Sequence, residues 1–215
     1  MKQARSPFRP LVLVAAALAV SACQAFQRAE PVQRIEIPPA PEEAAALAAA
    51  APRLTPTGTV VDARVQQLGA ELGALKAGVN DNLIEVRATR AAIADLAARY
   101  QTLVGGITAR LQVGTTPGNP ELISAWNEAQ GQLAGLEQNV GRLSSLSTRV
   151  AANAATANFL QSSIRSAYRL AGGIDQDHRN LDLLEDDTSR TIVVIERLLN
   201  ELADEVSRQS ATVAS

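Results

Sequence analysis

The feature that most limits how this chain can fold is a seven-residue apolar repeat that begins at Val61. From Val61 onward, apolar side chains recur at alternating steps of three and four residues, as in the seam of a coiled coil. The two series of seam positions are Val65, Leu72, Val79, Val86, Ile93, Tyr100 and Ile107, and Val61, Leu68, Leu75, Asn82, Thr89, Leu96 and Leu103. A repeat sustained over this length predicts one continuous helix that pairs lengthwise with another helix.

Several residues within this repeat weaken a helix or its seam. Gly69, Gly73 and Gly78 together cost about 3 kcal/mol relative to alanine, so the helix depends on a partner along its seam. The glycines either let a neighbouring backbone approach closely or are tolerated looseness. Asn82 and Thr89 either define the register of the seam or mark a thin, hydrated stretch of it. The sequence leaves both alternatives open.

A turn and a second helix of similar length follow. Residues 113–120, VGTTPGNP, stop the first helix because they hold two glycines and two prolines. The second helix starts near Pro120 and has the seam Leu122, Ala129, Leu136, Leu143, Val150, Ala157 and Ile164, flanked by Trp126, Leu133, Val140, Ser147, Ala154, Gln161 and Tyr168. Trp126 and Tyr168 are expected in the core. Two helices of matched length joined by a short turn fold back antiparallel.

A third helix is expected over residues 174–213, after Gly172 and Gly173. Its apolar stripe is broader than a two-helix seam requires, although Thr188 and Thr191 interrupt it. The stripe consists of Leu181, Leu184, Ile192, Ile195, Leu198, Leu199, Leu202, Val206 and Val213. The expected fold is therefore all-α: a long antiparallel coiled-coil hairpin over residues 59–171 plus a third helix, together an elongated helical bundle.

Two pairs of charges leave a homo-oligomer open. Glu71 with Lys76, and Glu85 with Arg90, have the spacing of ion pairs between parallel identical helices. The short turn and the matched helices favour a hairpin within one chain, with self-association as a further option.

The charge balance and the reactive residues argue against chemistry. The net charge of −2 becomes −5 without the first 22 residues, which hold Lys2, Arg5 and Arg9 and no acid. No basic stripe remains, so nucleic-acid binding is not expected. His178 is the only histidine, and with Asp175 and Asp182 it falls short of the donor set of a metal site. We therefore expect no metal, no cofactor and no catalytic residue.

The N-terminus, MKQARSPFRPLVLVAAALAVSAC, has a basic front and an apolar run of signal-peptide length. Val20, Ser21, Ala22 and Cys23 resemble the lipobox of bacterial lipoproteins. The resemblance implies that residues 1–22 are a signal peptide, that Cys23 is acylated, and that the protein is anchored in the outer membrane facing the periplasm. The alternative is an ordinary secretory signal cleaved after Ala22, which leaves Cys23 as a free thiol.

Residues 23–58 are expected to form a flexible linker after the acylated cysteine. Its helix-breaking prolines are Pro31, Pro38, Pro39, Pro41, Pro52 and Pro56. At about 3 Å per extended residue, this linker would hold the helices tens of ångströms from the membrane.

Residues 177–209 resemble the helical regions that precede an OmpA-like domain in certain Gram-negative lipoproteins. No OmpA-like domain follows in this sequence, so the peptidoglycan-binding residues of that domain have no counterparts here. The resemblance implies a helical lipoprotein and transfers no binding function.

These features predict a lipid-anchored coiled-coil protein of the cell envelope that acts as a spacer, tether or scaffold and binds other envelope proteins through its helices. The candidate docking residues at the turn are Thr115, Thr116, Pro117, Gly118 and Asn119. The alternative is an accessory or adaptor subunit of a trans-envelope transport or peptidoglycan-associated assembly. The sequence argues against an enzyme or a small-ligand receptor, because no convergent polar groups are visible.

Overall fold

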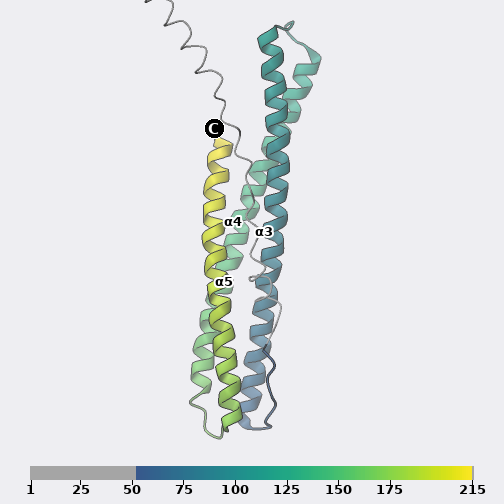
Figure 1. Cartoon of the computed structure of the whole chain (residues 1–215). Helices are drawn as coiled ribbons and strands as arrows, with labels where there is room; N and C mark the ends of the chain where they lie inside the picture. The colour runs from purple at the N-terminus through teal and green to yellow at the C-terminus, as the bar shows by residue number, and fades with distance from the viewer. Residues whose placement is uncertain (1–51, 215) are drawn as a thin grey trace, which may run out of the picture. The chain divides into compact units, whose positions relative to one another are not determined.

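The computed structural model describes residues 52–214 of the chain. The predictions for Val20, Ser21, Ala22 and Cys23, and for most of the 23–58 linker, lie outside the described residues. In the described part the chain forms three helices, α3 (Val60–Val113), α4 (Pro120–Ala167) and α5 (Asp175–Ala214), and no strand (Figure 1).

The ends of the hairpin helices follow from local sequence. The Thr59 hydroxyl accepts a hydrogen bond from the Asp62 amide and caps the start of α3. Gly114, at a φ of 98°, ends it. The Asn119 side chain caps α4 by accepting from the Glu121 amide, and Pro120 occupies the first position, where its missing N–H leaves no bond unmade.

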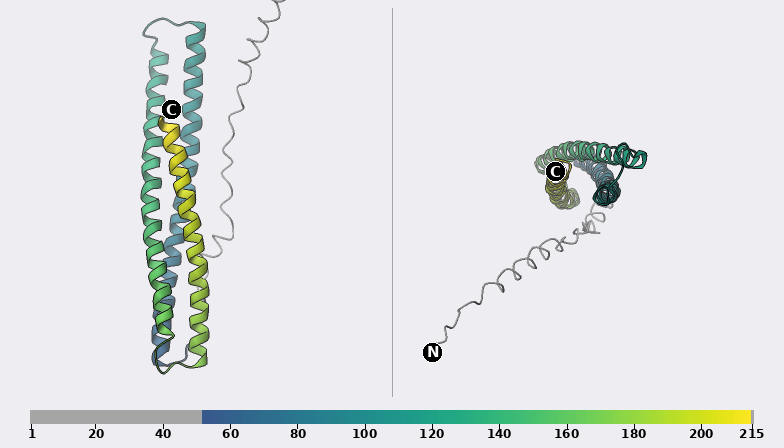
Figure 2. Two further views of the ribbon diagram at one scale, coloured as in Figure 1. Left: turned by 90° about the vertical axis from the view of Figure 1, so that its left-hand side faces the viewer. Right: turned by 90° about the horizontal axis from the view of Figure 1, so that it is seen from above.

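The expected all-α bundle is confirmed. Helices α3 and α4 form an antiparallel hairpin, and α5 packs along it (Figures 1 and 2). Lys76 contacts Asp187 and Arg90 contacts Glu201, each pair 111 residues apart, so α5 runs parallel to α3. Both α3 and α5 contact α4 more extensively than they contact each other.

The predicted seams supply most of the core. The most deeply buried large side chains are Val65, Leu68, Leu72, Val79, Leu143, Leu146, Leu160, Ile164, Leu181, Leu184, Ile195 and Leu202. Asn82 and Thr89 are buried in the α3 seam as well. On α5, Thr188 and Thr191 are buried and complete the stripe that they interrupt in sequence.

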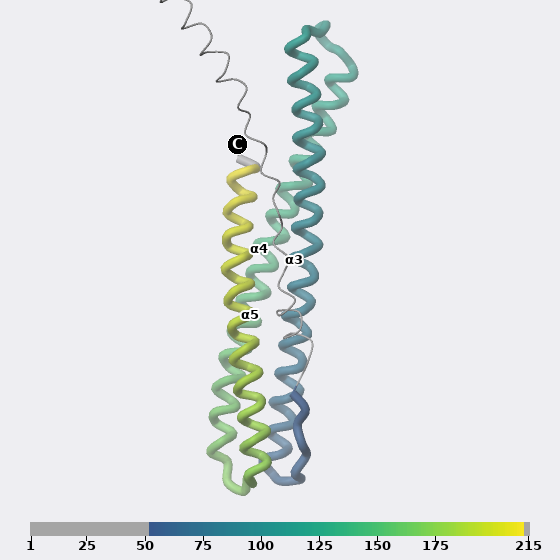
Figure 3. The backbone as a smooth tube through the Cα atoms, viewed as in Figure 1, coloured from purple at the N-terminus to yellow at the C-terminus, as the bar shows by residue number. Residues whose placement is uncertain are grey.

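Helix α5 is shorter than the hairpin on which it packs. Subtracting the offset of 111 residues from Ala214 places the end of α5 level with about residue 103 of α3. On α4, Tyr168 contacts Asp182 and Gln161 contacts Ser189, which places the same end near residue 136. The hairpin therefore extends beyond α5 over residues 104–135, here called the distal hairpin (Figure 3).

This difference in length explains one wrong prediction. Trp126, expected in the core, is 56% exposed, because it lies on α4 beyond the end of α5. Tyr168, which lies alongside α5, is half-buried and packs against the core as expected.

The ion pairs run within the chain. Lys76 pairs with Asp187, Arg90 with Glu201, and Glu85 with Arg149 of α4. Three of the four charged residues that left a parallel homo-oligomer open thus form ion pairs among the helices of one chain. Self-association stays a prediction.

The last residues of the expected linker are held against the bundle. The hydroxyls of Thr57 and Thr59 both donate to the Asp177 carboxylate of α5. Asn180 and the backbone of Thr55 exchange two hydrogen bonds, of 3.2 and 2.8 Å. The Leu54 side chain packs against the core at Gly69. These contacts join the chain before α3 to α5, a pairing that the sequence analysis did not anticipate.

Candidate docking site at the hairpin tip

The distal hairpin carries exposed large apolar side chains on both of its helices. On α3, Lys76 and Arg90 face α5, and seven-residue steps from them lead to Val104 and Leu111. On α4, the same steps lead from Gln161 to Trp126. Ile123 lies three residues before Trp126, on the adjoining part of the same helix surface. These four residues, Val104, Leu111, Ile123 and Trp126, form the distal apolar face.

All four side chains of the distal apolar face are exposed. The exposed fractions are 36% for Val104, 58% for Leu111, 52% for Ile123 and 56% for Trp126. Large apolar side chains gathered on one side of a helix pair are typical of a protein contact surface. Trp126 is also the only tryptophan of the chain, and tryptophan is enriched among residues that dominate binding energy.

Two exposed ion pairs lie in or near the distal hairpin. Arg110 and Glu121 form an ion pair across the end of the hairpin, with side chains 58% and 69% exposed. Asp95 and Arg99 pair along α3, 59% and 63% exposed. Such exposed pairs contribute little stability.

A small cavity lies between the two helices near the tip. Its volume is about 210 Å³, and it is lined by Thr102, Leu103, Gly106, Ile107, Arg110, Glu121, Leu122 and Ala125. Leu103, Ile107 and Leu122 are seam residues, yet they stay half-exposed because a two-helix seam is too narrow to cover them. This cavity could receive one apolar side chain of a partner.

The predicted docking residues form a well-defined loop between the helices. The Asn119 amide donates to the Thr115 hydroxyl at 3.0 Å, and the Asn119 backbone donates to the Thr116 carbonyl at 3.3 Å. Gly118 adopts a φ of 78°, which favours glycine. Thr115, Thr116, Pro117 and Gly118 are exposed, and Asn119 is half-buried. Their role in docking stays a prediction. The distal apolar face beside them was missed because the sequence predicts where α5 ends to within one residue but not which residues of α3 and α4 lie level with that end.

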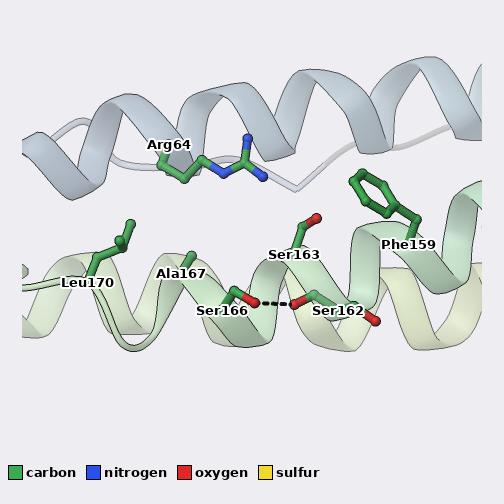
Figure 4. Close-up of a pocket in the computed structure, with 7 residues that line it drawn as sticks. All are labelled: Arg64, Phe159, Ser162, Ser163, Ser166, Ala167 and Leu170. Carbon is green, nitrogen blue, oxygen red and sulfur yellow. Dashed lines mark hydrogen bonds between the residues drawn. The ribbon is translucent and has the colours of Figure 1, made fainter.

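A second cavity, of about 260 Å³, lies between α3 and α4 near the opposite end (Figure 4). It is lined by Arg64, Phe159, Ser162, Ser163, Ser166, Ala167 and Leu170. The Ser162 hydroxyl donates to the Asn158 carbonyl and the Ser166 hydroxyl to the Ser162 carbonyl. None of these lining residues is a histidine or a carboxylate, the side chains that most often activate a serine.

The three residues considered as metal donors do not form a cluster. Within residues 52–214 no group of three histidine, cysteine, aspartate or glutamate side chains could hold a metal ion. The His178 ring contacts the Ile174 carbonyl, and Asp182 accepts a hydrogen bond from the Tyr168 hydroxyl at 2.6 Å. Burial, together with Asp182, raises the pKa of Tyr168.

The structure defines a three-helix bundle with a protruding hairpin. No described helix has an apolar stretch that would cross a membrane. The chain matches no protein-family model, no curated protein and no solved structure.

Proposed function

We propose that this protein is a lipid-anchored envelope protein that acts as a tether or scaffold and binds its partner through the distal hairpin. One observation carries the proposal: Val104, Leu111, Ile123 and Trp126, four large apolar side chains of the distal hairpin, are all exposed. Exposed large apolar side chains that lie close together are typical of a protein contact surface.

The anchor rests on the sequence. Val20, Ser21, Ala22 and Cys23 match a lipobox behind a basic front and an apolar run. Acyl chains on Cys23 would hold the protein at the periplasmic side of the outer membrane. More than one chain would be needed, because a single acyl chain binds a membrane only marginally. The three-helix part would then supply a stiff element that places the distal hairpin at a distance from the anchor.

A Cys23→Ser variant tests the anchor. We expect it to move from the membrane to the soluble periplasmic fraction while its circular dichroism spectrum stays helical, because Cys23 lies far in sequence from all three helices. Retention of the variant in the membrane fraction would contradict the lipid anchor.

In-cell photo-crosslinking tests the docking surface. A photoreactive amino acid at Trp126 is compared with one at Val193, which is 63% exposed on α5 outside the distal hairpin. We expect discrete crosslinked products from position 126 and none from position 193. Equal yields from both positions would rule out a specific site at the tip.

The same experiment separates the second candidate function. An adaptor subunit of a trans-envelope assembly would give one dominant crosslinked product from position 126. A passive spacer would give no dominant product, although Cys23→Ser would still release it from the membrane.

A further inference from the structure

We propose that the cavity between α3 and α4 that Figure 4 shows binds a small apolar monocarboxylate, whose carboxylate group is held by Arg64 and Ser163. This inference goes beyond the proposed docking function. It concerns the opposite end of the hairpin and depends neither on the distal apolar face nor on the lipid anchor.

Arg64 supplies a positive charge that the surrounding residues do not neutralise. Its side chain is half-buried, and none of the residues that line the cavity is acidic. Within residues 52–214 its guanidinium forms neither an ion pair nor a hydrogen bond. A guanidinium presents a planar fork of N–H donors that matches the two oxygens of a carboxylate. The charge of the site therefore favours an anionic ligand, and its geometry favours a carboxylate.

The hydroxyl of Ser163 adds a second polar group to the same space. Figure 4 shows the side chains of Arg64 and Ser163 between the ribbons of α3 and α4. The hydroxyls of Ser162 and Ser166 donate to backbone carbonyls of their own helix. The Ser163 hydroxyl forms no hydrogen bond to any described residue, so its proton is available to a ligand oxygen.

Apolar side chains flank these two polar groups. Phe159 lies on one side of Ser163 and Leu170 on the other (Figure 4), and they are 67% and 47% exposed. Ala167 adds a buried methyl group to the lining. A ligand that covered Phe159 or Leu170 would remove apolar surface from water, which an inorganic anion at Arg64 would not do. The lining thus favours a carboxylate that carries an apolar body.

The volume of the cavity limits the size of this ligand. At about 30 Å³ per non-hydrogen atom, as in a liquid, 260 Å³ holds about nine such atoms, which corresponds to a monocarboxylate of about eight carbons. Sites for drug-sized ligands are larger. For so few contacts we expect a dissociation constant on the order of 1 mM.

A nuclear magnetic resonance titration with octanoate tests the site. The protein is the full chain with Cys23→Ser, so that neither acyl chains nor detergent compete for the ligand. Octanoate is added up to about 10 mM, which brackets the expected dissociation constant. We expect the largest amide shifts at Ser163, Ala167 and Leu170. Acetate, which lacks the apolar body, and octanol, which lacks the charge, should each bind at least fivefold more weakly.

Two variants and a control assign the binding to these residues. Arg64→Gln removes the charge and keeps a polar side chain, so we expect octanoate to bind at least tenfold more weakly. Ser163→Ala should weaken binding about threefold. The control is Arg165→Gln, which removes an arginine of α4 that is 61% exposed, pairs with Glu185 and does not line the cavity. It should bind octanoate as the parent chain does. Circular dichroism should stay helical in all three.

Four outcomes would overturn the proposal. The first is an absence of amide shifts at the lining residues up to about 10 mM octanoate. The second is equal binding of octanoate by Arg64→Gln and the parent chain. Equal binding of acetate and octanoate would reveal an adventitious ion only, and equal binding of octanol would reveal an apolar contact in which Arg64 has no part. Each of these outcomes would leave crosslinking from position 126, and with it the docking function, untouched.

Discussion

Lys76 of α3 and Asp187 of α5 form an ion pair in the interior of the bundle. The lysine Nζ lies 2.7 Å from Asp187 Oδ2, and the two side chains are 3% and 15% exposed. Both oxygens of the carboxylate accept from this ammonium, the other at 2.9 Å. The pair joins the two helices that contact each other least, so it helps to define how α5 lies against α3.

The first prediction follows from this pair. Asp187→Ala leaves the Lys76 ammonium buried without this carboxylate, so we expect the free energy of unfolding to fall by about 2 kcal/mol in urea denaturation. That value lies below the range for fully buried pairs because solvent reaches Asp187. The control is Asp186→Ala, which removes a pair with Arg190 that is 59% exposed on both sides. Asp186→Ala should change the free energy of unfolding by less than about 0.5 kcal/mol. An equal loss of stability in Asp186→Ala and Asp187→Ala would contradict a special role for the buried pair.

The second prediction concerns acid. Burial raises the pKa of Asp177, but hydrogen bonds from Thr57, from the Ile174 backbone and from Thr59 outweigh it, so the pKa lies below its usual range. Because the folded state binds this proton less readily than the unfolded state, the stabilisation is present above pH 4 or so and is lost as the pH falls below it. Urea midpoints measured from about pH 6 to about pH 3 should fall over the acid end of that range.

Asp177→Asn is the matched variant for this titration. We expect it to be less stable than the parent at neutral pH and to lose less further stability in acid. A residual acid dependence should remain, because a hydrogen bond from Gln66, followed by one from the Gly58 backbone, lowers the pKa of Asp62 as well. Parallel pH profiles for parent and variant would show that Asp177 does not carry the effect.

The third prediction uses two glycines of α3. A Cβ at Gly73 would meet nothing within 4 Å, so Gly73→Ala should raise the free energy of unfolding by about 0.5–1 kcal/mol through helix propensity. A Cβ at Gly69 would lie 2.6 Å from Leu54 Cδ1, so Gly69→Ala must displace Leu54 and should gain less. Thermal denaturation of the two variants measures both gains in stability. A larger gain from Gly69→Ala than from Gly73→Ala would refute a close approach at Gly69.

The fourth prediction addresses Asn82, which is 7% exposed in the α3 seam. Its side chain forms no hydrogen bond to another residue in the part of the chain that the structure describes. We therefore expect Asn82→Leu to raise the free energy of unfolding by about 1 kcal/mol, since an apolar seam residue avoids burying an amide. A loss of stability, or a change of oligomeric state in sedimentation, would instead support a role for Asn82 in the register.

Much of the fold was predictable because the repeat is a local property of the chain. Val65, Leu72, Val79 and Val86 were assigned to the seam from their spacing alone, and all four are buried. The turn was predictable for the same reason, since the residues that stop α3 and start α4 are neighbours in sequence.

The candidate site was not predictable in the same way. Trp126 has the spacing of a core residue, and whether it is covered depends on where another helix ends. The hydrogen bonds of Thr57 and Thr59 with Asp177 join positions 120 and 118 residues apart, and no local pattern connects such distant residues.

The sequence by itself determined three helices, their seams and the hairpin turn, because helical periodicity and turn chemistry act between residues a few positions apart. Only the tertiary structure decided which seam positions lose contact with water, because burial depends on the relative lengths and register of helices far apart in the chain. Trp126 is the example: its spacing is that of a seam residue, yet it is 56% exposed on a part of α4 that does not lie alongside α5.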